Sequence, residues 1–193
     1  MPPNYAGCIE NANFLTKTTT LKVKIFTTSF DSPLGTIHLA STTKGLCLLE
    51  FDDEKRIDGY FKQFNKYWDV ELKKKETKTT TTTKLQLDEY FNGKRTTFKL
   101  PLNLVGTDFQ INVWNELLKI PFGVTRSYKE QALAIGNLKV IRAVATANGE
   151  NRISIIVPCH RIIGSDGSLT GYGGGIWRKQ QLLELESAQA KLF

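Results

Sequence analysis

The patterning of the chain changes from strand-like to helical at an extended segment near residues 101–106, which Pro101 opens. Before it, three apolar runs at 24–30, 35–40 and 46–51 have strand character, and the turn Ser32-Pro33-Leu34-Gly35 separates the first two. After it, apolar residues recur at helical spacing. The sequence therefore predicts a mixed α/β (α+β) protein, with a small N-terminal antiparallel sheet and a mainly helical C-terminal domain.

This change divides the chain into an N-terminal extension at 1–23, an α/β domain at 24–100 and a C-terminal domain at 101–193. Within the α/β domain we expect helices at about 54–66 and 85–92, the second ending at Asn92-Gly93. Two threonine- and lysine-rich stretches, at 16–24 and 77–84, predict exposed extended chain.

The C-terminal domain contains a predicted helix-turn-helix. Thr107 is a candidate N-cap for a first helix that ends before Gly123. Two short helices, at about 127–135 and 139–147, then follow with Gly136-Asn137 between them. The stretch 119–161 has seven basic and two acidic residues, so it carries +5 of the net charge of +7. This charge favours a DNA-binding helix pair, although a helical hairpin with a solvated basic face remains the alternative.

The apolar run at 153–157 predicts a buried strand that ends in Pro158-Cys159-His160-Arg161. A reactive thiol needs a base or a positive field, which His160 and Arg161 can supply. The alternative is that Cys159 is a small buried apolar residue. Cys8 and Cys47 form no Cys-x-x-Cys pair with it, and the chain has two histidines, so we expect no disulfide framework, no metal and no cofactor.

A glycine-rich loop at 164–175 follows the cysteine and contains one aromatic residue, Tyr172. Its glycines allow backbone atoms to approach a flat ligand closely, with Tyr172 as a stacking face. A plain surface loop is the alternative. An amphipathic helix is expected from Ile176 to about Leu185.

These motifs together resemble the O6-alkylguanine-DNA alkyltransferases, also called methylated-DNA–protein-cysteine methyltransferases. The resemblance is dense from about 106 to 186 and thinner before it. The matching motifs are Ile155-Ile156-Val157-Pro158-Cys159-His160-Arg161, Gly171-Tyr172-Gly173-Gly174-Gly175, Gly106-Thr107-x-Phe109-Gln110, Ile120-Pro121-Phe122-Gly123, Arg142-Ala143-Val144 and Asn148-Gly149-x-Asn151.

The resemblance implies that Cys159 takes an alkyl group from guanine O6 in DNA and keeps it as a thioether, so that each molecule reacts once. It further implies that His160 deprotonates the thiol through a water, that Glu186 orients the imidazole and that Asn151 supports the turn. Tyr128 would donate a hydrogen bond to guanine N3.

The partner implied is double-stranded DNA containing O6-alkylguanine, bound through the minor groove with little sequence specificity after the nucleotide is flipped out. Arg142 would fill the gap left by that nucleotide, and Ala143, Lys139 and Arg126 would contact the DNA. Residues implied for the substrate pocket are Tyr172, Gly173, Ile162, Lys179, Asn148 and Ser154. We expect a monomer.

Three alternatives remain open at this point: a lesion binder without chemistry, a cysteine hydrolase and a DNA-binding regulator. Two positions depart from the family pattern. Arg152 stands where proline is usual and Ala145-Thr146 where glycine is common, and we expect neither to touch the chemistry. The segments 1–20 and 73–84 have no counterpart. With no apolar run near 20 residues and no signal-peptide pattern, an intracellular protein is expected, cytoplasmic or, in a eukaryote, nuclear.

Overall fold

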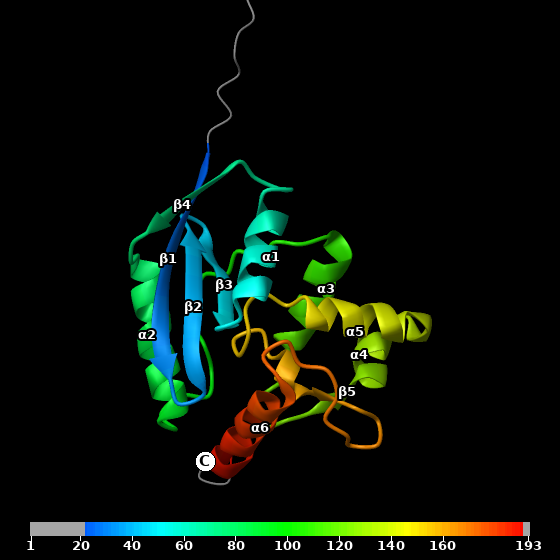
Figure 1. Ribbon diagram of the computed structural model, residues 1–193. Helices are drawn as coiled ribbons and strands as arrows, with labels where there is room; N and C mark the ends of the chain where they lie inside the picture. The colour runs from blue at the N-terminus through cyan, green and yellow to red at the C-terminus, as the bar shows by residue number, and fades with distance from the viewer. Residues whose placement is uncertain (1–21, 191–193) are drawn as a thin grey trace, which may run out of the picture.

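The computed structural model describes residues 22–190, so all but the last two residues of the predicted extension and most of the stretch at 16–24 lie outside the described residues. The N-terminal half forms a four-stranded sheet in the order β3-β2-β1-β4 (Figure 1). Its strands are β1 (Val23–Ser32), β2 (Gly35–Thr42), β3 (Gly45–Phe51) and β4 (Val70–Lys74). The predicted antiparallel sheet is confirmed for β1 to β3, whereas β4 was not predicted and pairs parallel to β1.

Two helices cover opposite faces of this sheet (Figure 1). Helix α1 (Glu54–Phe64) places Ile57, Tyr60 and Phe64 in one apolar cluster, and α2 (Lys78–Phe91) places Leu87 and Tyr90 in the other. The second cluster continues into the C-terminal half, so one core joins both halves of the chain. The domain boundaries given above stay a prediction.

The threonine-rich stretch at 77–84 is not exposed extended chain, as predicted, but the start of α2. Thr77 and Thr80 form a reciprocal capping box, and the Thr83 hydroxyl donates to the Thr79 carbonyl at 2.8 Å. Thr80 and Thr83 are fully buried. Their hydroxyls are satisfied within the helix, so burial against the sheet outweighs the low helix propensity of threonine.

The C-terminal half is mainly helical and contains the predicted helix pair. Thr107 and Ser127 are N-caps, each in a capping box. Gly136, with φ +90°, turns the chain between the helices of the pair. The elements are α3 (Asp108–Leu117), β5 (Arg126–Ser127), α4 (Tyr128–Ala134), the 3₁₀ turn η1 (Leu138–Val140), α5 (Ile141–Gly149), the 3₁₀ turn η2 (Cys159–Arg161), β6 (Ile162–Ile163) and α6 (Ile176–Ala190).

The run at 153–157 is buried but is not the predicted strand. Only Ile153 forms an isolated bridge, to Leu49, and the chain then turns back with Ile155 at φ 69°. The Asn151 side chain holds this turn, because it accepts from the Ile153 amide at 3.0 Å and donates to the Val157 carbonyl at 2.8 Å. We call residues 151–157 the Asn151 turn. Among the described residues, no helix is long and apolar enough to cross a membrane.

The packing of the segment around residue 101 against β3 predicts a strong effect of Gly45→Ala. Gly45 has φ +147°, and a Cβ there would collide with the Pro101 backbone. We expect the free energy of unfolding to fall by about 2–4 kcal/mol, combining backbone strain with overpacking. Chemical denaturation monitored by circular dichroism measures it. Gly59→Ala, in α1 with open space around the Cβ, is the control and should stabilise the protein by about 0.5–1 kcal/mol.

Candidate active site

The thiol of Cys159 lies at the start of η2, shortly after the Asn151 turn, and Cys159 is 7 % exposed. The Asn151 amide donates a hydrogen bond to its sulfur at 3.3 Å. Burial raises the pKa of Cys159 to about 11, and Glu50 adds to this, whereas Asn151, Lys179 and Arg56 oppose it. The resting thiol is therefore protonated at neutral pH, and a nucleophile forms only if a base takes its proton.

His160 is the next residue and is fully buried. Its Nε2 lies 2.9 Å from Glu186 Oε1. A carboxylate there accepts a hydrogen bond, so we assign the proton to Nε2 and leave Nδ1 with a free lone pair. Nδ1 is buried and has no hydrogen-bond partner among the described residues. Burial lowers the pKa of His160, although the Glu186 contact raises it in part, so the ring is neutral and can accept a proton.

Glu186, on α6, is buried and receives donors from several elements. The Tyr90 hydroxyl on α2 donates at 2.9 Å, the Gly123 amide at 3.1 Å and the Arg161 guanidinium through Nε and Nη2, each at 2.9 Å. Burial raises the pKa of Glu186, but its bonds and ion pairs with His160 and Arg161 outweigh this and hold the pKa well below the ordinary 4.5. The carboxylate is ionised and fixes the imidazole.

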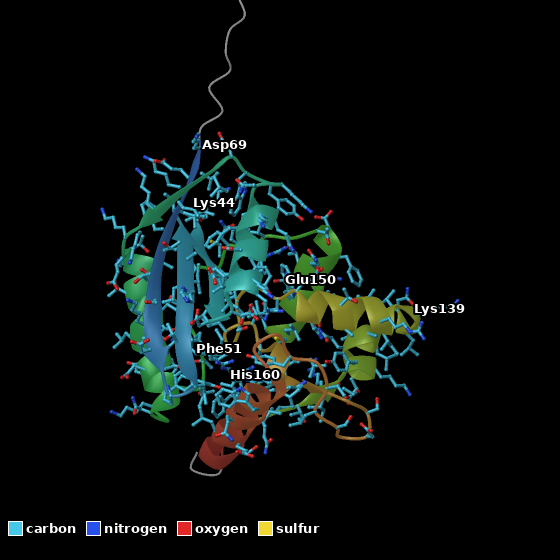
Figure 2. All side chains as sticks on the ribbon, in the orientation of Figure 1. Lys44, Phe51, Asp69, Lys139, Glu150 and His160 are labelled. Atoms are coloured by element: carbon cyan, nitrogen blue, oxygen red, sulfur yellow. The ribbon has the colours of Figure 1, made fainter. Side chains whose placement is uncertain are left out.

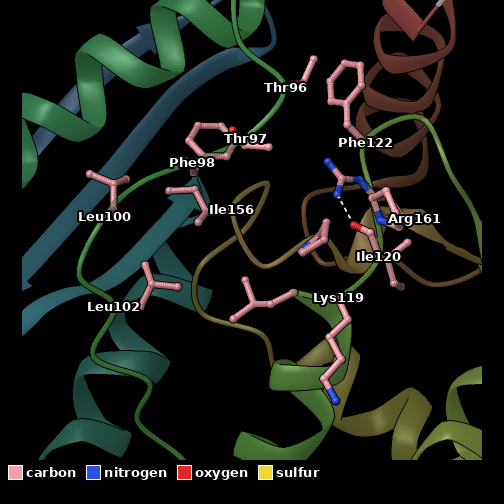
Figure 3. A pocket seen from close by; sticks show the side chains of 13 residues that line it. Thr96, Thr97, Phe98, Leu100, Leu102, Lys119, Ile120, Phe122, Ile156 and Arg161 are labelled. Atoms are coloured by element: carbon pink, nitrogen blue, oxygen red, sulfur yellow. Dashed lines mark hydrogen bonds between the residues drawn. The ribbon is translucent and has the colours of Figure 1, made fainter.

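Arg161 does not supply the positive field at Cys159 that the sequence predicts. Its guanidinium pairs with Glu186, donates to the Ile120 carbonyl at 2.6 Å and lies 5.8 Å from the Phe122 ring (Figure 3). A cavity of about 320 Å³ lies on this side of the chain, lined largely by apolar residues from 98–102 and 118–122. The cations that lower the pKa of Cys159 are Lys179 and Arg56 instead.

A separate cavity of about 480 Å³ brings together four of the residues implied for the site: Tyr128, Arg142, Tyr172 and Gly173. Tyr128 and Tyr172 pack against the apolar cluster that contains Cys159, so the sulfur lies near this cavity. Burial raises the pKa of both tyrosines, and a thiolate at Cys159 would raise it further.

The glycine-rich loop contributes Thr170 to the lining of this cavity. The Thr170 carbonyl accepts from Tyr128 at 3.2 Å and from Lys179 Nζ at 2.6 Å. Burial lowers the pKa of Lys179 to about 8, so this ammonium loses its charge more readily than a surface lysine.

Four residues implied for the substrate pocket do not line this cavity: Lys179, whose bond to the Thr170 carbonyl is described above, and Asn148, Ser154 and Ile162. The Asn148 amide pairs with Gln131, with bonds of 2.7 and 3.2 Å, and so joins α4 to α5. Ser154 donates to buried Glu50 at 3.1 Å, and Ile162 is fully buried in β6. These three side chains stabilise the segments around the cavity and do not line it.

The residues implied for DNA contact lie on the surface of the helix pair. Arg142 and Ala143 are exposed on α5, and Lys139 lies at its outer end, away from His160 (Figure 2). Half-buried Arg126 lines a hollow beside the loop at 163–167. Arg142 is the one of the four that also reaches the cavity described above.

Sequence reasoning missed Glu50, Arg56 and Tyr90. Arg56 comes from α1 in the first half of the chain and lines the same cavity as Arg142. Charged or polar residues in predicted strands and helices give no signal of a distant partner, so these three could not be found from spacing. Within the described part of the chain, no three histidine, cysteine or acidic residues converge in a way that could hold a metal.

Comparison with known proteins agrees with this geometry. The DNA-binding domain model of the 6-O-methylguanine DNA methyltransferases matches residues 108–188, and the ribonuclease-like domain model of the same family matches residues 25–104. The chain belongs to this family.

Relatives in this methyltransferase family cover most of this chain. The methylated-DNA–protein-cysteine methyltransferase of Methanosarcina barkeri is 47 % identical over 157 residues, which cover 81 % of this chain and 93 % of that protein. The constitutive enzyme of Bacillus subtilis is 41 % identical over 150 residues, covering 76 % and 86 %. The Mycobacterium tuberculosis OGT solved in complex with DNA has a TM-score of 0.72 and 43 % identity, covering 86 % of this chain and 94 % of that one.

The Glu186 contacts predict that Glu186→Gln destabilises the protein by about 3–5 kcal/mol, because it leaves the Arg161 charge buried and without its counter-ion. The folded-state pKa of Glu186 is depressed, so its stabilisation is fully present above the ordinary pKa of 4.5 and is lost as the pH falls through the folded-state pKa. The difference in the free energy of unfolding between Glu186→Gln and wild type should therefore be constant around neutral pH and become smaller in acid. Urea unfolding across pH measures it.

Glu184→Gln is the matched control, because Glu184 lies on the same helix but is exposed, and among the described side chains it accepts hydrogen bonds from Gln180 and Gln181 alone. Its effect should stay within about 0.5 kcal/mol. A similar loss in both variants would contradict a special role for Glu186.

Proposed function

We propose that this methyltransferase repairs DNA by moving the alkyl group of O6-alkylguanine onto the sulfur of Cys159, once per molecule. The observation that carries the proposal is a buried thiol, with a neutral histidine next to it, close to a cavity that the helix pair shares through Arg142. Membership of the family supports the same reaction.

The proposed step begins with the Cys159 proton, which passes through a water to His160 Nδ1. Glu186 keeps the Nε2 proton and stabilises the imidazolium that forms. The thiolate then attacks the alkyl carbon in line. The C–S bond forms as the bond to O6 breaks, and its electron pair stays on the guanine, where the Tyr128 hydroxyl donates to N3. Because burial keeps the thiol protonated at rest, this histidine makes the nucleophile only when the substrate is in place.

The product explains why each molecule reacts once. A thioether is not a leaving group under mild conditions, unlike the thioester of a cysteine hydrolase. No water activated by His160 can regenerate Cys159. The protein is therefore consumed in proportion to the lesions that it repairs.

The DNA partner is proposed to bind as a duplex through the minor groove, with α5 as the recognition helix. The target atom lies inside the stack, so the nucleotide must be flipped out, at a cost of a few kcal/mol. Arg142 offsets part of this cost by filling the gap, since it is exposed and lines the cavity. Ala143 allows close approach, and Lys139 and Arg126 contact phosphates. We propose a monomer that acts in the compartment holding the DNA, cytoplasm or nucleus.

The acceptor assignment predicts that Cys159→Ser binds duplex DNA containing O6-methylguanine but removes no methyl group, since a hydroxyl is a far poorer nucleophile than a thiolate. Intact-mass and peptide analysis after incubation with excess lesion DNA should show one methyl per wild-type molecule, on Cys159, with no later turnover. Cys47→Ser is the control and should react as wild type, because Cys47 is buried in the sheet and burial raises its pKa to about 12. A methyl group on Cys47 or Cys8, or steady turnover, would refute the assignment.

The role of Arg142 predicts a difference between two substrates. Arg142→Ala should slow transfer from the duplex by about tenfold or more, because only the duplex demands flipping. Transfer from free O6-methylguanine base should stay close to the wild-type rate. Single-turnover kinetics on both substrates test this, and equal losses would mean that Arg142 acts in another way.

A further inference from the structure

Arg152, the residue that departs from the family pattern, has an unusual environment. It is 3 % exposed, and no carboxylate pairs with its guanidinium among the described residues. Its Nη1 donates to the Val105 carbonyl and its Nη2 to Gln63 Oε1 on α1. Three aromatic rings surround the cation at 5.3–5.8 Å from their centroids, those of Tyr60, Phe64 and Trp114. A buried cation without a counter-ion is costly, and here two oxygen acceptors and three ring faces offset part of that cost, although the buried Nε has no hydrogen-bond partner among the described residues.

The backbone beside Arg152 is held from the same side. The Leu49 amide on β3 donates to the Arg152 carbonyl at 2.8 Å, and the Ser154 amide donates to the Leu49 carbonyl at 2.7 Å. The Tyr60 hydroxyl on α1 donates to the Asn151 carbonyl at 3.1 Å. The start of the Asn151 turn is therefore fixed by the first half of the chain.

Asn151 connects this anchorage to the sulfur. Its amide donates to Cys159 Sγ at 3.3 Å and to the Val157 carbonyl at 2.8 Å. A hydrogen bond weakens as its donor moves away from the acceptor or out of line with it. A movement of the backbone at Arg152 would therefore take the amide away from the sulfur.

We propose that Arg152 is a positioning residue for alkyl transfer, through which α1 holds the Asn151 amide against the sulfur of Cys159. This inference rests on the proposed function only for the identity of the reaction. It gives the N-terminal half of the chain a direct part in preparing the nucleophile.

The test compares Arg152→Met and Arg152→Lys with wild type, with Arg95→Met as a matched control. Arg95 is a half-buried arginine that pairs with Glu89, and it lies far along the chain from the turn. Iodoacetamide labelling of Cys159, followed by peptide mass analysis across pH, reports the thiolate without requiring DNA. Single-turnover transfer from lesion duplex is measured in parallel, below the melting temperature of every variant.

In Arg152→Met the Asn151 amide should no longer be held against the sulfur, so the Cys159 thiolate loses this hydrogen bond. The pH midpoint of Cys159 labelling should therefore move up by roughly one unit, and transfer should slow by about tenfold at neutral pH. Arg152→Lys keeps the positive charge and one donor nitrogen, so its labelling midpoint and its transfer rate should both lie between those of Arg152→Met and wild type. Arg95→Met should match wild type. Duplex affinity, measured in the Cys159→Ser background, should not change. The ionisable groups that face the sulfur are unaltered in all variants: Glu50, Arg56, Tyr60, Tyr128, His160, Tyr172 and Lys179.

An unchanged labelling midpoint in Arg152→Met would overturn the proposal, even if the melting temperature falls, because Arg152 would then serve stability alone. If that variant does not fold, Gln63→Leu removes one acceptor of the same cation. It should show a smaller shift in the same direction, and no shift there would overturn the proposal too. Wild-type protein that gains no methyl group from lesion DNA would refute the proposed function, whereas the labelling result would still decide the role of Arg152.

Discussion

The buried carboxylate of Glu186 is the interaction on which the rest of the site depends. Desolvating a carboxylate costs several kcal/mol, and good geometry with charged donors must offset that cost. Here the donors come from α2, from the segment after α3 and from η2, so Tyr90, Gly123, His160 and Arg161 are all located by one anion on α6. The same contacts set the tautomer of His160. The base and the fold are therefore stabilised by a single group.

A second constraint is the environment of the sulfur. The site opposes ionisation of Cys159 by burial and supports it by a few placed groups, of which the Asn151 amide touches the sulfur. This balance suits a protein that can react only once, because a thiolate exposed at rest would be lost to other electrophiles. The sheet and α1 belong to this balance, since they hold the turn that carries Asn151.

Local signals predicted much of the fold. Thr107 and Ser127 start helices because their side chains satisfy the first free amides of the helix, and this needs only nearby residues. The same reasoning failed at 77–84, where burial against the sheet overrides threonine's preference for extended chain. It failed again at 153–157, where an apolar run was interpreted as a strand although the Asn151 side chain folds it into a turn.

The sequence by itself determined the family and the helix pair, and it pointed to Cys159 and His160 as the proposed nucleophile and base, because each of these signals lies in residues close together along the chain. The tertiary structure alone decided which groups complete the site. Tyr90 reaches Glu186 across 96 residues and Gln63 reaches Arg152 across 89. The tertiary structure also shows that Arg161 pairs with Glu186, whereas the sequence predicted that it would act on the sulfur. Such contacts depend on how the sheet, α1 and α6 pack together. The sequence around a buried charge therefore does not predict which distant residue pairs with it.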